Sequence, residues 1–221
     1  MLSDAPAKSL LLDDFYDDFY AGDMDETPIE DLVPDYSILD QVDYHYPVND
    51  AYFTYASRGC IRKCKFCGVP KLEGGMREMG PLGNVVDGVK ELYGEKKDLI
   101  LMDNNVVASE RFDEIINEII ELGFVPGAKI KRGKSSALRR VDFNQGVDAR
   151  ILSQDISVMK KLSKICLKPL RIAFDHIGIM KHYVQAVRYA HDVGIDTLSN
   201  YMLYNYHDTV EDLFDRMRVN V

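Results

Sequence analysis

Three of the four cysteines lie within eight residues, in the run CIRKCKFC at positions 60–67. Their spacing is C-x3-C-x2-C. Thiolates this close on one loop can occupy three corners of a metal site, and iron–sulfur clusters are held by such thiolates. A cluster with three protein ligands keeps one iron open for a substrate or cofactor. The candidate metal ligands are Cys60, Cys64 and Cys67.

The same loop is rich in positive charge, which suits a cluster that its thiolates make net negative; the bases are Arg58, Arg62, Lys63 and Lys65. The alternative is a structural zinc site, in which four protein ligands fill all the coordination positions. Cys166 or a histidine would have to supply the fourth, and neither stands at the spacing of a zinc motif. We therefore favour the cluster, and we interpret Cys166 as a small buried apolar side chain.

The elements that must position this loop alternate between strand and helix. Strands are expected at 51–57, 98–102, 141–148, 170–174 and 197–204, and helices at 82–93, 110–122, 154–165, 180–193 and from Thr209 onward. No hairpin signal lies between these units. Such alternation predicts a parallel sheet with crossover helices, either open or closed into a barrel.

Polar residues follow each predicted strand, and in parallel α/β folds the chemistry gathers at the carboxyl ends of the strands. The polar candidates at these ends are Asp103, Asn104, Asn105, Asp148, Arg150, Asp175, His176 and residues 205–208. Simpler interpretations stay open. Residues 103–105 can merely end a strand, Asp148 and Arg150 can form a structural ion pair, and His176 and His191 are more often packing or surface residues.

The run SRGCIRKCKFC at 57–67 resembles the signature of the radical S-adenosylmethionine (radical SAM) enzymes, including the aromatic residue before the third cysteine. Its RGC-x3-C-x-F-C form is similar to that of cobalamin-associated and methylthiotransferase-like members. The segments PDYSIL at 34–39, DNN at 103–105 and NYHDT at 205–209 resemble further parts of that group. The similarity extends from about residue 34 to the C-terminus.

The resemblance implies an α/β fold of the radical SAM type, a partial (βα) barrel of which five strand–helix units are visible. It implies a 4Fe-4S cluster on the three cysteines, which reductively cleaves S-adenosylmethionine to a 5′-deoxyadenosyl radical that abstracts hydrogen from a substrate. By position, the implied cofactor contacts are Phe66 and Asn205 to the adenine, Asp103, Asn104 and Asn105 to the amino group, Asp148 to the ribose and Arg150 to the carboxylate.

The family also implies an electron donor such as flavodoxin or ferredoxin. The chain has too few cysteines for a complete auxiliary cluster and no room before residue 51 for a cobalamin-binding domain. Barrels of the family usually have six units, so we expect a chain truncated at its C-terminus. The competing class is a non-catalytic iron–sulfur or zinc module that serves as a structural or interaction part.

Composition limits the classes further. The chain has 221 residues, of which 46% are hydrophobic and 29% charged, as in a soluble globular protein. Residues 1–50 hold 14 acidic residues and one base, whereas residues 51–221 hold 22 acidic residues and 26 bases. We therefore divide the chain into an acidic leader with an extended lead-in, 1–50, and a core, 51–221. The aromatic and acidic pairs at 13–20 predict either an amphipathic helix or a partly disordered arm.

The N-terminus has neither a basic region nor a long apolar run, so we expect no signal peptide, no membrane span and a cytoplasmic protein. Four cysteines do not make a disulfide scaffold. Six bases between residues 129 and 140 could contact nucleic acid. No aromatic residue is interleaved with them, so we interpret them as a solvated connection.

Overall fold

The structure is a computed structural model that describes residues 32–204 and 206–220. The chain divides into two units, 1–32 and 33–221, and everything that follows concerns the second unit. The expectations for the leader at residues 13–20, and that for Asn205, lie outside the described residues.

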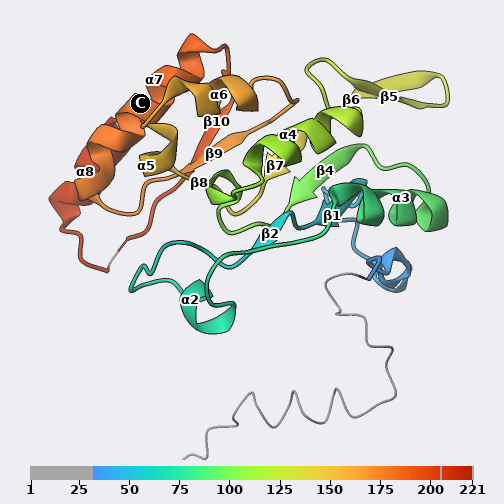
Figure 1. Cartoon of the computed structure of the whole chain (residues 1–221), viewed down its shortest axis with the longest axis horizontal. Helices are drawn as coiled ribbons and strands as arrows, with labels where there is room; N and C mark the ends of the chain where they lie inside the picture. The colour runs from blue at the N-terminus through green and yellow to red at the C-terminus, as the bar shows by residue number, and fades with distance from the viewer. Residues whose placement is uncertain (1–31, 205, 221) are drawn as a thin grey trace, which may run out of the picture. The chain divides into compact units, whose positions relative to one another are not determined.

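The strands that follow the helical crossovers form two parallel sheets (Figure 1). In the first, β1 (Ala51–Thr54), β4 (Asp98–Leu101) and β7 (Val141–Phe143) lie in that order; in the second, β10 (Leu198–Tyr201), β9 (Leu170–Ala173) and β8 (Val147–Asp148). An isolated parallel bridge pairs Val141 of β7 with Leu167, which lies just before β9 in the chain. The predicted α/β class with parallel strands is confirmed, and the described strands form no closed barrel.

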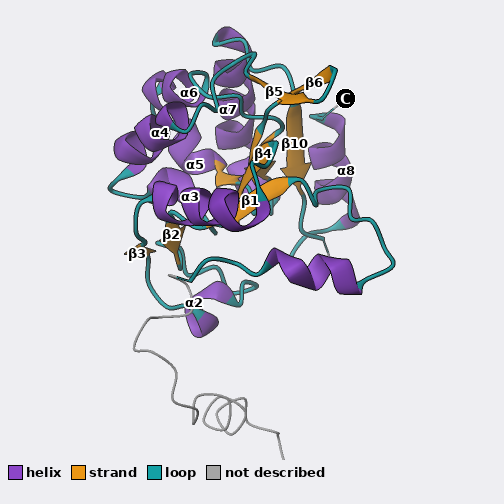
Figure 2. Ribbon diagram, turned by 90° about the vertical axis from the view of Figure 1, so that its right-hand side faces the viewer, coloured by secondary structure: helices purple, strands orange, loops and turns teal. Residues whose placement is uncertain are grey.

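The longer helices alternate with these strands, and the last of them follows β10. They are α3 (Leu82–Tyr93), α4 (Phe112–Glu121), α6 (Ile156–Leu162), α7 (Met180–Asp192) and α8 (Val210–Arg218), with a short α5 (Ala149–Leu152). Figure 2 shows α3 to α7 gathered on one side of the strands and α8 beside β10. The last helix begins as expected, because Thr209 and Asp212 form a capping box.

Smaller elements complete the unit. They are the 3-10 helices η2 (Tyr36–Gln41), η3 (Val106–Ala108) and η4 (Ile177–Ile179), the helix α2 (Val69–Leu72), and the strand pairs β2 (Ser57–Arg58) with β3 (Arg77–Glu78) and β5 (Lys129–Arg132) with β6 (Ser135–Leu138). The lead-in is tied to β1, because the Tyr36 hydroxyl donates to Ala51 O at 2.8 Å and accepts from Phe53 N at 2.9 Å.

Apolar periodicity explains why these elements form. All four residues of β4 are buried, as expected for a strand covered on both faces. Helix α4 buries Phe112, Ile115, Ile116 and Ile119, which share one face at helical spacing. Burial of such side chains stabilises the fold by roughly 1.5–3 kcal/mol each. Strand β4 and helix α4 are thus anchored in the core, and the polar residues 103–105 follow β4 directly.

Three expectations for the strands are wrong in detail. The predicted strand at 51–57 is in fact two strands, β1 and β2. The predicted strand at 141–148 is also two, β7 and β8, because Gly146, at φ +81°, turns the chain between them. A hairpin does interrupt the alternation: β5 and β6 pair antiparallel, with Arg132 opposite Ser135 across a two-residue turn that starts at Gly133, φ +59°.

This hairpin carries most of the basic segment. Lys129, Lys131, Arg132 and Lys134 are exposed on it, and Arg132 is held by the Asp50 carboxylate at 2.8 Å. The segment is thus an ordered β-ribbon rather than a plain connection into a strand. None of the helices among the described residues is both long and apolar enough to cross a membrane.

Candidate functional site

A cavity of about 480 Å³ lies at the carboxyl ends of β7 to β10, where the cysteine loop meets the sheet. The loop leaves β2 and ends at α2, and it turns at its centre through a hydrogen bond from Cys67 N to Cys64 O of 3.0 Å. The cavity is lined by Cys60, Arg62, Cys64, Phe66, Cys67, Val69, Asn104, Asn105, Asn144, Gln145, Gly146, Val147, Asp148, Arg150, Ala173, Asp175, Ile179 and Tyr201. Segments far apart in sequence thus converge on the three thiols.

Glu73 fixes the start of the cysteine loop. One of its carboxylate oxygens accepts from Gly59 N at 2.9 Å, Arg58 Nε at 3.0 Å and Asn104 Nδ2 at 3.0 Å. Burial raises the pKa of Glu73, but these three donors outweigh it and hold the pKa below its usual value. Glu73 therefore joins the loop to the end of β4 as a carboxylate.

Gly59 has no room for a side chain. Its φ is +73°, and a Cβ there would overlap the carbonyl oxygen of Gly75. We expect Gly59→Ala to lower the free energy of unfolding by clearly more than the roughly 1–2 kcal/mol that a left-handed conformation costs an L-residue. Urea unfolding measures the loss.

The matched control is Gly74→Ala. Gly74 has φ +77° but nothing within 4 Å of the position of a Cβ, so it has the conformational cost without the overlap. Equal losses of stability in the two variants would mean that Gly75 does not confine the loop at Gly59.

Asp103 holds the chain just before the loop. Its carboxylate accepts from Ala56 N at 3.0 Å, Ser57 N at 2.5 Å and Ser57 Oγ at 2.7 Å, and the residue is buried. Burial raises the pKa of Asp103 to about 6, although the hydrogen bonds oppose the rise. Asp103 does not line the cavity, so its oxygens position the loop rather than face a ligand.

The raised pKa gives a pH-dependent stability. Because the folded chain keeps this proton to a higher pH than the unfolded chain, stability is present below pH 3.8 and is lost as the pH rises through about 6. We expect the advantage of the native chain over Asp103→Asn in urea unfolding to shrink by about 2.4 kcal/mol between pH 4 and pH 7. A difference that does not change with pH would contradict this assignment.

Asp148 connects the loop to the second sheet. Its carboxylate accepts from Arg62 Nε at 2.7 Å, Arg150 Nε at 2.8 Å and Arg150 N at 2.9 Å. Burial raises the pKa of Asp148, but the two arginines outweigh it and hold the pKa below its usual value. The ion pair considered for Asp148 and Arg150 thus exists, and Arg62 is its third member.

Three residues contact the thiols directly: Arg62, Asn105 and Arg150. Burial raises the pKa of the Cys60 thiol, while hydrogen bonds from Arg62 N at 3.4 Å and the Asn105 side chain act to lower it. Arg150 also hydrogen-bonds Cys64. The pKa of Arg150 is raised mainly by its hydrogen bond with Asp148 and, to a smaller extent, by the one with Cys64. The contacts to Cys60 favour its thiolate, the form that binds metal, but burial outweighs them and keeps the pKa of Cys60 above its usual value.

The donor set of this cavity fits an iron–sulfur cluster. It offers three thiols on one loop with arginines beside them, and the fourth cysteine, Cys166, lines a different cavity. Among residues 32–204 and 206–220, no group of three or more His, Cys, Asp or Glu side chains is placed to hold a single metal ion.

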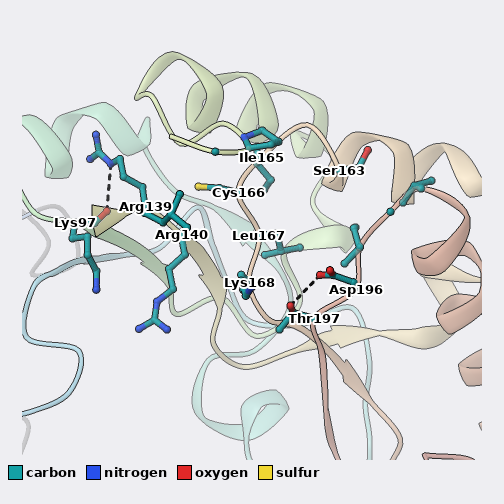
Figure 3. Close-up of a pocket in the computed structure, with 16 residues that line it drawn as sticks. Lys97, Arg139, Arg140, Ser163, Ile165, Cys166, Leu167, Lys168, Asp196 and Thr197 are labelled. Carbon is teal, nitrogen blue, oxygen red and sulfur yellow. Dashed lines mark hydrogen bonds between the residues drawn. The ribbon is translucent and has the colours of Figure 1, made fainter. Parts of the chain in front are cut away.

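That different cavity, of about 610 Å³, lies at the amino ends of β4, β7, β9 and β10 (Figure 3). Its bases are largely engaged: Arg139 binds Glu95 at 3.1 Å and Arg140 binds Asp98 at 2.8 Å. Figure 3 shows their guanidinium groups pointing in different directions. Cys166 is only partly buried against the core, less than the buried side chain expected from the sequence, and this burial raises its pKa to about 11.

Most of the residues singled out from the sequence thus meet in the cysteine cavity. They are Cys60, Arg62, Cys64, Phe66, Cys67, Asn104, Asn105, Asp148, Arg150 and Asp175. Sequence reasoning missed Glu73, Tyr201 and the turn at 144–146. A signal for Glu73 existed, since Glu73 and Glu78 are the only acidic residues between positions 51 and 86, among six bases.

No protein-family model matches the sequence, and no curated protein matches it either. The chain is an α/β protein whose parallel strands carry, at their carboxyl ends, a cavity lined by three cysteines and two arginines.

Proposed function

We propose that this chain is a radical SAM enzyme whose 4Fe-4S cluster is held by Cys60, Cys64 and Cys67. One observation carries the proposal: the three thiols line a single cavity at the carboxyl ends of parallel strands, and the fourth cysteine lies at the opposite ends. Three thiolates for four irons leave one iron for the amino and carboxylate groups of S-adenosylmethionine.

When bound, the cluster supplies one electron that cleaves a carbon–sulfur bond of S-adenosylmethionine, giving methionine and a 5′-deoxyadenosyl radical that abstracts hydrogen from a substrate. The protein's part is to orient the cofactor and to balance the negative charge of the thiolates. Arg62 and Arg150 place two cations beside the thiolates, and Asp148 fixes both. We assign the ring of Phe66, on the wall of the cavity, to the adenine.

The finer fold belongs to the same proposal. The six strands of the two sheets are parallel, with α3 to α7 on one side (Figure 2). This arrangement supports a partial (βα) barrel of the radical SAM type, open where further strands would close it. The cavity then faces the concave side, where a substrate can approach.

The partner we propose is a low-potential electron donor such as flavodoxin or ferredoxin. Lys63 and Lys65 are exposed on the cysteine loop and would attract an acidic carrier. Since such a cluster needs reducing conditions, we place the protein in the cytoplasm. We propose no nucleic-acid partner.

The test is anaerobic purification of the full chain, followed by reconstitution with iron and sulfide. We expect a brown protein with about four irons per chain that forms 5′-deoxyadenosine from S-adenosylmethionine when dithionite is added. A protein that binds only zinc and leaves S-adenosylmethionine intact would overturn the proposal in favour of a structural zinc module. A cluster without cleavage would favour a non-catalytic iron–sulfur module.

A further inference from the structure

A second cavity at the carboxyl ends adjoins the cysteine cavity. It has a volume of about 530 Å³, and the two cavities share Cys64, Phe66 and Asp175 as lining residues. On its other side lie η4 and the loop after β10, which contributes Tyr206 and His207. A molecule in this cavity would therefore lie directly beside the proposed cofactor site.

The carboxylates of this cavity differ in how far their oxygens are already engaged. Asp208 pairs with the buried Arg216, and Asp212 accepts from Thr209 N at 3.0 Å in the capping box of α8. Asp175 has no hydrogen-bond or ion-pair partner among the described residues. It is half-buried, and its arginine neighbours Arg150 and Arg216 are committed to other carboxylates. His176, which also lines the cavity, lies near enough to act on Asp175 electrostatically but makes neither a hydrogen bond nor an ion pair with it. Asp175 thus keeps its full capacity to accept hydrogen bonds.

Aromatic rings border the same space. Phe66 and Tyr206 meet edge to face with centroids 5.6 Å apart, and the Tyr206 and His207 rings lie 4.2 Å apart. Both Phe66 and Tyr206 are exposed at the cavity, 37% and 41%. Ring faces attract ammonium groups electrostatically, and a carboxylate beside them adds a charge-assisted hydrogen bond. Lys65 also borders the cavity, but it is exposed, so solvent screens its charge.

We propose that this cavity binds the substrate and that the substrate carries a primary or methylated ammonium group, held by the carboxylate of Asp175 against the ring of Tyr206. The inference rests on the proposed function, because it takes the neighbouring cavity as the place where the radical forms. It adds the chemical class of the substrate, which the cysteine site alone does not give.

The experiment measures binding and not turnover. Butylammonium is titrated into the cluster-loaded full chain and followed by saturation-transfer difference NMR, with butyrate as the probe of opposite charge. We expect butylammonium to bind with a Kd on the order of 1 mM and butyrate to bind at least tenfold more weakly. Equal binding of the two probes would overturn the proposal.

Matched variants locate the site. Asp175→Asn should weaken butylammonium at least tenfold, while Asp196→Asn, an exposed aspartate in the cavity at the other ends of the strands, should leave it unchanged. Tyr206→Phe should keep most of the affinity and Tyr206→Leu should lose several-fold, because only the ring is needed. Tyr206 is exposed, so these variants should fold even if Asp175→Asn does not.

Two further outcomes decide the assignment. Displacement of butylammonium by S-adenosylmethionine, which itself carries an ammonium group, would assign the cavity to the cofactor and overturn the inference. The two proposals also fail separately. Cleavage of S-adenosylmethionine without Asp175-dependent binding would overturn only the substrate class, and binding without cleavage would overturn the enzymatic function.

Discussion

Cys64→Ser is expected to lower the iron content of the reconstituted chain at least tenfold and to abolish formation of 5′-deoxyadenosine. The serine hydroxyl is nearly isosteric with the thiol but stays protonated at neutral pH, so it cannot replace a thiolate ligand. Cys64 is an informative position for this test, because it lies at the turn of the cysteine loop and forms a hydrogen bond with Arg150. The same result is expected for Cys60→Ser and Cys67→Ser.

The control is Cys166→Ser. Cys166 lines the cavity at the amino ends of the strands, so its replacement should leave both iron content and cleavage unchanged. Far-ultraviolet circular dichroism of each variant separates loss of a ligand from loss of the fold. Full iron content in all three loop variants, or loss of iron in Cys166→Ser, would contradict the assignment of the ligands.

The parts of the fold that sequence predicts well are those that local pattern encodes. Helix α4 shows apolar residues at helical spacing, and β4 is a short apolar run that ends in Asp103, so both were found close to their observed bounds. The β5–β6 hairpin escapes sequence prediction because β5 is mostly charged and β6 is mostly small, and Ile130 is the only buried residue of the two strands. Apolar periodicity carries no signal in such a ribbon.

The site divides in the same way. The cysteines are close in sequence, so their spacing alone indicates metal chemistry. The supporting contacts are tertiary: Arg62 and Asp148 are 86 positions apart, and Asp103 and Ser57 are 46 apart. The family resemblance implies, by position, that Asp103 contacts the amino group of the cofactor. Only the structure shows that its carboxylate turns back to the chain before the cysteine loop.

A buried arginine, Arg216 of α8, ties the two last strand ends together. Its side chain is 0% exposed, and it donates to Phe174 O at 2.5 Å and Leu203 O at 2.7 Å while it pairs with Asp208. Its Nε is buried without a partner among the described residues. Burial of the guanidinium group lowers the pKa of Arg216. Arg216 thus holds the loop that carries Tyr206 and, through Phe174, the strand end at Asp175.

We expect Arg216→Met to lower the free energy of unfolding by about 3–5 kcal/mol, because it leaves the Asp208 carboxylate buried and unpaired. Urea unfolding measures the loss. The matched control is Arg218→Met on the same helix. Arg218 is 71% exposed and 3.9 Å from Asp215, so its loss should change stability by no more than about 0.5 kcal/mol.

The cause of the loss can be separated from the loss itself. One explanation for the loss of stability in Arg216→Met is the unpaired Asp208 carboxylate. In that case the double variant Arg216→Met with Asp208→Asn should be more stable than Arg216→Met alone, because Asp208→Asn removes that carboxylate. If the double variant is no more stable, the two carbonyl groups of Phe174 and Leu203 account for the cost instead. Arg216 would then act on the backbone of the strand ends, and Asp208 would be incidental to its role.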